Sequence, residues 1–141
     1  MADFFATADA IQAEIEARIP AVKKVYQAKD LDGVTNASQV APAVHVLFSG
    51  YVPAQAGRAR ENITLDQTWS VVLVVRHARG QEQQEGGAIL DELVRVLHGF
   101  KPGDSLLALE LAPAAFSPTY RPGVAYYPLA FTTRVVNRKG A

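Results

Sequence analysis

Three histidines are the first residues to test for chemistry, because an imidazole can transfer protons and bind metals near neutral pH. They are His45, His77 and His98. His45 and His77 fall on neighbouring predicted strands and could approach each other, whereas His98 falls in the last turn of a predicted helix. A zinc site needs three or four ligands, and no HxH or HxxxH pair is present. We therefore expect no metal and no cofactor.

Serine and carboxylate groups give no stronger catalytic signal. Ser49 or Ser70 could act as a nucleophile beside a histidine, but neither lies in the strand–turn–helix context of a nucleophile elbow. Asp91 and Glu92 are neighbours on the outer side of a predicted helix, where carboxylates are ordinarily solvated. The run Asp30-Leu-Asp-Gly33 lacks the ligand spacing and the closing glutamate of an EF-hand. These patterns predict a protein that is not an enzyme.

The whole-chain composition indicates one ordinary globular domain over residues 1–141. Fourteen basic residues balance fourteen acidic ones, so the chain lacks the basic surplus of a protein that coats nucleic acid. The absence of cysteine excludes disulfides and thiolate metal sites. No basic region opens the chain and no apolar run reaches the ~20 residues of a membrane span. We expect a protein soluble in the cytoplasm of the cell that makes it.

The clearest structural signal is a strand followed by a helix, between Trp69 and Phe100. Residues 71–75 are all apolar, which predicts a central strand covered on both faces. Apolar residues then recur at helical spacing between Ile89 and Phe100, with Asp91, Glu92 and Arg95 opposite them. Such a unit forms a core.

The remaining elements follow in order. In the first half we predict a helix over residues 4–19, an edge strand over 22–28, a loop over 29–42 and an antiparallel strand pair over 44–51 and 63–76 that is joined by a hairpin tip over 53–62. A flexible polar loop is predicted over 78–87 and a turn over 101–104. A strand over 106–111, an irregular stretch over 113–122 and a last strand over 124–136 complete the chain. Pro128 cannot donate to a ladder, so its strand lies at an edge or Pro128 faces a gap or bulge. The predicted fold class is α+β: a mainly antiparallel or mixed sheet with two helices packed on one face and a long hairpin tip.

The second half of the chain resembles a known family. The segments that carry the resemblance are Trp69-Ser-Val-Val-Leu-Val-Val-Arg76, Ile89-Leu-Asp-Glu-Leu93, Leu97-His-Gly-Phe-Lys-Pro102, Leu109-Glu-Leu111 and Val124-Ala-Tyr-Tyr-Pro-Leu-Ala-Phe-Thr-Thr133. Their succession resembles that in the tail terminator and tail-completion proteins of long-tailed bacteriophages, including the Mu-like prophage type. The predicted first helix fits the N-terminal helix of that family, so the likeness covers most of the chain.

The resemblance implies a structural protein that forms a ring, usually a hexamer, on the end of the tail tube. The ring stops polymerisation of the tube and joins the tail to the head or neck. The implied partners are further copies of the chain, the tail tube protein, a neck or head-completion protein and, in contractile tails, the sheath protein; genomic DNA passes through the lumen without specific binding. The implied location is the tail or neck of the virion, after assembly in the cytoplasm of the bacterial host.

Two loops flank the central strand and are the expected contact sites in such an assembly. The hairpin tip is longer than a tight turn requires, and long loops within domains are often functional. Arg58 and Arg60 could bind a phosphate or an acidic neighbour, or lie solvated beside Glu61. The expected interface residues are Pro53, Gln55, Arg58, Arg60, Glu61, Arg79 and Gln81.

Other classes of protein stay open at this point. The chain could be a different head–tail connector or neck protein, or a small-ligand-binding or regulatory α+β domain with one enclosed pocket. It could also be an enzyme that uses His45 or His77, although no activity can be named from the sequence.

Overall fold

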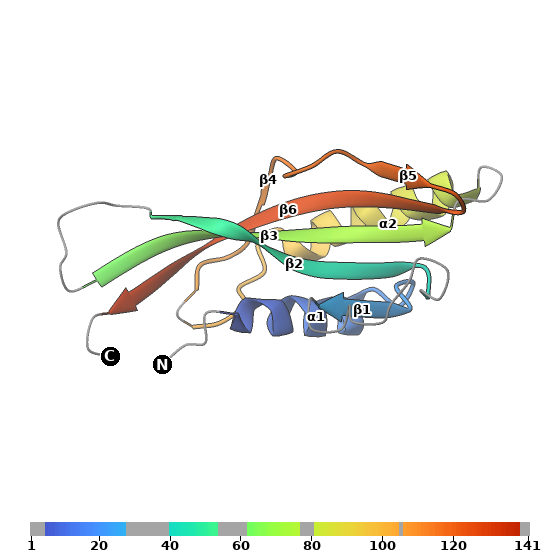
Figure 1. Cartoon of the computed structure of the whole chain (residues 1–141). Coiled ribbons are helices and arrows are strands. Elements are labelled where there is room, and N and C mark those ends of the chain that lie inside the picture. The colour runs from blue at the N-terminus through green and yellow to red at the C-terminus, as the bar shows by residue number, and fades with distance from the viewer. Residues whose placement is uncertain (1–4, 28–39, 54–61, 77–80, 105, 139–141) are drawn as a thin grey trace.

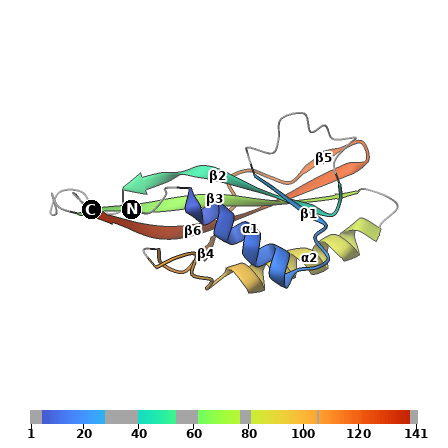
Figure 2. The ribbon, with the colours of Figure 1, turned by 90° about the horizontal axis from the view of Figure 1, so that it is seen from below.

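One mixed sheet forms the centre of the structure, and two helices cover one of its faces (Figure 1 and Figure 2). The computed structural model describes residues 5–27, 40–53, 62–76, 81–104 and 106–138. Its elements are α1 (Ala6–Arg18), β1 (Lys24–Gln27), β2 (Ala43–Pro53), β3 (Asn62–Arg76), α2 (Gln81–Leu97), β4 (Glu110–Ala112), β5 (Thr119–Arg121) and β6 (Val124–Arg138). The α+β class predicted from the sequence is confirmed.

The sheet is built around the two longest strands, β3 and β6, which pair antiparallel along their full length. The strand order is β1-β2-β3-β6-β4, and β5 also pairs with β6. Only β1 and β2 run parallel among these pairs. The antiparallel hairpin of β2 and β3 that the sequence predicts is therefore present, and the short predicted edge strand is β1.

Alternation along β3 explains how its apolar run is buried on both faces. Trp69, Val71, Leu73 and Val75 point toward the helices and belong to the main core, together with residues from both helices. That helix layer contributes Ile11, Ile15, Ile19, Ile89, Leu93 and Leu97, all of them at most 2% exposed. On the other face, Val72 is 4% exposed, so the predicted double coverage of this strand is confirmed.

The middle of β3 carries an aromatic cluster that joins the sheet to the start of α1. The ring centroids of Phe48 and Trp69 lie 5.1 Å apart, and Phe5 meets Phe48 edge-on at 5.4 Å. The indole Nε1 of Trp69 donates to Oε1 of the fully buried Gln67 at 3.2 Å. Aromatic contacts of this kind add to the stabilisation from burial alone.

Pro128 faces a gap, which was one of the two predicted alternatives. It lies opposite Val72 in the β3–β6 ladder. On the outer side of β6, β5 pairs with residues 124–126 and β4 with residues 130–132. Pro128 falls between these two pairings, so no strand partner loses a hydrogen bond there.

The predicted polar loop over residues 78–87 is wrong where the structure describes it. Helix α2 already begins at Gln81. The glutamine and glutamate residues at 81–85 have good helix propensity, whereas the low propensity of Gly86 and Gly87 favoured the prediction of a loop. Gly86 is buried within the helix beside the side chains of Val75 and Tyr127, where an added Cβ would make ordinary contacts at 3.7–3.8 Å.

Two predictions for the segment before β6 are also wrong in part. The strand expected over residues 106–111 is reduced to β4 and one isolated bridge between Leu106 and Val135. The reason is that the backbone of Leu109 bonds to the turn after α2, through Gly99 N–H and the carbonyl of Phe100. The stretch expected to be irregular over residues 113–122 contains β5, which forms a tight hairpin with β6.

Candidate functional site

The residues with catalytic potential do not form a reactive cluster in the described part of the chain. The hydroxyls of Ser49 and Ser70 hydrogen-bond to each other at 2.5 Å. His98 follows α2, and its Nδ1 accepts a hydrogen bond from the backbone N–H of Leu111 at 3.1 Å. His77 lies outside the described residues. Within the described ranges, no group of three or more His, Cys, Asp or Glu could hold a metal ion.

His45 is a buried side chain of the sheet. Its ring stacks on Tyr26 of the neighbouring strand, with centroids 5.1 Å apart and planes inclined by 24°. Burial lowers the pKa of His45 below its ordinary value of 6.5, because the charged imidazolium loses hydration. The neutral ring therefore acts here as an aromatic packing group.

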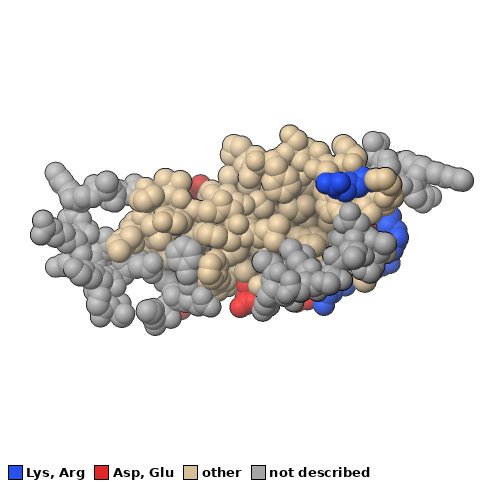
Figure 3. All heavy atoms as spheres, viewed as in Figure 1, with Lys and Arg blue, Asp and Glu red and all other residues tan. Residues whose placement is uncertain are grey.

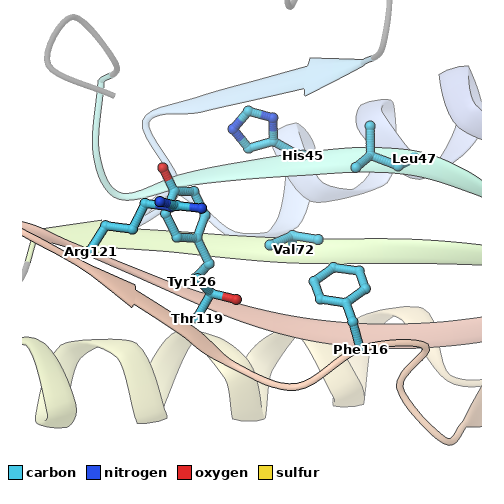
Figure 4. Close-up of a pocket in the computed structure, with 7 residues that line it drawn as sticks. All are labelled: His45, Leu47, Val72, Phe116, Thr119, Arg121 and Tyr126. Atoms are coloured by element: carbon cyan, nitrogen blue, oxygen red, sulfur yellow. The ribbon is translucent and has the colours of Figure 1, made fainter. Parts of the chain in front are cut away.

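A groove lies beside His45 on the sheet face opposite the helices (Figure 4). Its volume is about 280 Å³, and its lining residues are His45, Leu47, Val72, Phe116, Thr119, Arg121 and Tyr126. Leu47, Val72 and Tyr126 rise from β2, β3 and β6, while Phe116, Thr119 and Arg121 come from the segment that leads into and through β5. The groove is therefore mainly apolar, with one cation at its rim.

The most distinctive exposed feature is a three-stranded arm, formed by residues 50–53 of β2, 62–68 of β3 and 131–138 of β6. These strand ends project beyond both helices (Figure 1). Four large apolar side chains on the arm are exposed: Tyr51 by 56%, Val52 by 63%, Ile63 by 54% and Val136 by 41%. Val52 and Val136 lie on the face away from the helices, whereas Tyr51 and Ile63 lie on the helix-side face. Exposed apolar side chains on both faces mark the arm as a part that contacts another molecule.

One ion pair ties the middle strand of the arm to its neighbour. The guanidinium of Arg134 donates from Nε and Nη2 to both carboxylate oxygens of Asp66, at 2.8 and 3.2 Å. The hydrogen bond from Arg134 lowers the pKa of Asp66 below its ordinary value. Because both side chains are exposed, the pair fixes the arm's geometry more than it adds to stability.

Of the seven interface residues expected from the sequence, the structure describes two, and only one of these lies on the arm. Pro53 is the last residue of β2 and is exposed. Gln81 is the first residue of α2, at the opposite end of the sheet. Gln55, Arg58, Arg60, Glu61 and Arg79 lie outside the described residues. Sequence reasoning missed Val52, Ile63 and Val136, whose apolar character within strands resembles that of core residues.

Neither α1 nor α2 is long and apolar enough to cross a lipid bilayer.

Comparison with known proteins identifies the family. The model of the phage tail terminator protein family matches residues 1–140, nearly the whole chain. A search of curated proteins found no match. A chain from the solved virion of a native gene transfer agent particle is 17% identical, with a TM-score of 0.54 over 94% of this chain and 99% of that chain, and thus shares the fold. A second solved chain is 20% identical over 90% of this chain and 94% of its own, but its TM-score of 0.47 is too low to support a comparison. This family consists of structural, non-enzymatic components of the virion tail, and the chain belongs to it.

Proposed function

We propose that this chain forms a hexameric ring at the end of a tail tube, where it stops polymerisation of the tube and joins the tail to the head or neck. The observation that carries this proposal is the tail terminator match over residues 1–140. In this proposal residues 1–141 act as one domain and assemble in the cytoplasm of the bacterial host. Genomic DNA passes through the ring without specific binding, in keeping with a formal net charge of zero.

The arm is the part of the chain that we assign to the tail tube. The arm buries some of its apolar side chains, such as Leu65 and Val135, but leaves others exposed on both of its faces. Val52 and Ile63 belong to adjacent strands and are each more than half exposed. They lie on opposite faces of the arm, and contact of a face with the rim of a tube would remove its apolar side chain from water, which supplies the driving force for end binding.

The residues near the strand ends are proposed as further contacts. Pro53, Gln55, Arg58, Arg60 and Glu61 follow or join the arm in sequence, and they are assigned to the tube, the neck protein or the sheath protein. Arg79 and Gln81 precede or begin α2 at the other end of the sheet, so they are assigned to a separate contact in the assembly.

Negative-stain microscopy of the purified protein mixed with tail tubes tests the proposal. The expected images show a ring of added density at tube ends and none along tube walls. A chain without residues 54–61 serves as the comparison: it should keep its circular-dichroism spectrum and label fewer ends. If the intact chain forms no ring and binds no tube ends, the proposed function is wrong.

A further inference from the structure

The described charges are divided between two surfaces of the molecule. The sequences of the two helices contain seven acidic residues and only two basic ones, Arg18 and Arg95; the acidic residues with described side chains are Asp9, Glu14, Glu16, Glu85, Asp91 and Glu92. Each arginine already pairs with an acid one turn earlier on its own helix, Glu14 and Asp91. The helix layer therefore presents a negative surface.

The opposite face of the sheet is positive at the end away from the arm. Arg76 and Arg121 both lie opposite Val124, one on each side of it, so the three residues form one row across the sheet. Val75 points into the helix-side core, and successive side chains of a strand point to opposite faces, so the side chain of Arg76 points to the other face. The ladder places Arg121 on that same face, where it lines the groove (Figure 4).

Lys24 adds a third cation to this surface. It precedes Val25 of the helix-side core, and its ammonium lies 5.8 Å from the ring centroid of Tyr26. Figure 3 views this face and shows lysine and arginine gathered toward the same end of the sheet. Among the described residues, no acidic side chain forms an ion pair with Lys24, Arg76 or Arg121.

A negative stripe on α2 matches this positive row in spacing. Glu85, Ala88 and Glu92 are exposed and lie three and four residues apart, so they share one side of the helix. Seven residues separate the two glutamates, which corresponds to about 10 Å along a helix. Two strand spacings, also about 10 Å, separate Arg76 from Arg121. The small side chain of Ala88 between the two acids permits close approach.

We propose that α2 of one copy of this chain docks against the cationic row and the groove beside it on the next copy. The inference rests on the proposed ring and specifies the contact that builds it. Two different surfaces of opposite charge make a head-to-tail contact, which closes into a ring when the rotation between copies allows. A two-fold pairing of either surface with itself would bring like charges together, which disfavours a symmetric dimer.

Charge reversal on either side of the contact provides the test. One variant carries Arg76→Glu and Arg121→Glu, and a second carries Glu85→Arg and Glu92→Arg. The association of each full chain is measured by sedimentation velocity at low and high salt, with and without tail tubes. Each variant alone should associate at least about tenfold more weakly than the wild type, because like charges then face each other. Wild-type association should itself weaken with salt.

Mixing the two variants is the decisive arm of the experiment. In a ring of alternating variants, the reversed row of one variant faces the reversed α2 of the other, and the unchanged α2 of the first faces the unchanged row of the second. Opposite charges meet at every contact, so such rings should form again. A Lys101→Glu variant changes an exposed cation outside both surfaces and should associate like the wild type. Circular dichroism checks that every variant is folded.

Several results would overturn the inference. They are failure of the two folded variants to assemble when mixed, wild-type association by either variant alone, or a wild-type chain that never associates. Unchanged association together with weaker, salt-dependent binding of duplex DNA by the arginine variant would assign the row to nucleic acid instead. Rings that form by this contact but leave tube ends bare would contradict the proposed function and preserve the inference.

Discussion

Replacing Val52 by lysine tests the role of the arm, because the side chain contributes little to the fold and much to the proposed contact. Val52 is 63% exposed. Full burial of a valine is worth about 1.5–3 kcal/mol, so covering the exposed 63% contributes about 1–2 kcal/mol per subunit. Losing that contribution weakens the binding of each subunit roughly 5- to 25-fold, before the cost of placing an ammonium against an apolar surface is added. The free energy of unfolding should change by no more than about 0.5 kcal/mol, as for other exposed positions.

The assay counts tube ends that carry density as a function of protein concentration. The matched control is Val40→Lys, because Val40 is also a valine, is 45% exposed and precedes β2 at the end of the sheet opposite the arm. Val52→Lys should shift the midpoint of end binding to higher concentration, and Val40→Lys should not. Equal midpoints for Val52→Lys and the wild type would refute the assignment of the arm to the tube. An equal shift in both variants would show that added charge, not the arm, is responsible.

Three further predictions concern the fold. Trp69→Ala removes a side chain that is 2% exposed and packed against Phe48, so the free energy of urea unfolding should fall by about 3–5 kcal/mol; a loss below about 1 kcal/mol would contradict the packing described. The folded pKa of His45 lies below 6.5, so only the unfolded chain takes up this proton as the pH first falls. Stability is therefore complete above pH 6.5 and declines between pH 6.5 and the folded pKa, and His45→Gln should reduce this decline in urea unfolding at pH 7.5 and 5.5. Gly87→Ala places a methyl group on an exposed position of α2 with no atom within 4 Å, and it should raise the unfolding free energy by about 0.5–1 kcal/mol; a decrease would mean that α2 does not include this position.

Periodicity in the sequence predicted the centre of this fold because burial there follows simple rules. The apolar run at residues 71–75 occurs in the strand that is covered on both faces, and the helical stripe from Ile89 to Leu97 lies in α2. Pro128 has no backbone N–H to donate, which predicted an edge or a gap beside it, and the structure has the gap between β5 and β4. The errors arose where tertiary contacts outweigh local preference. Gly86 is helical although it favours a loop, with Val75 and Tyr127 packed beside it, and Leu109 leaves the ladder because its backbone bonds to the turn after α2.

The candidate surfaces were harder to predict than the core. Val52 and Ile63 resemble residues of half-buried strands, and only the three-dimensional arrangement reveals that the arm extends past both helices and leaves them exposed. The cationic row depends on register, since Arg76 and Arg121 are 45 residues apart and meet only through Val124. Zero net charge concealed this separation of charge between the two surfaces.

Growth of tail tubes in the presence of the protein tests the central claim most directly. Preformed tubes are mixed with excess tube protein, with and without the chain, and their lengths are measured by electron microscopy over time. The account predicts that tubes treated with the chain stop lengthening and carry a ring at the blocked end, while untreated tubes continue to grow. Continued growth at the same rate in both samples would contradict the assignment of this chain as the protein that ends the tube.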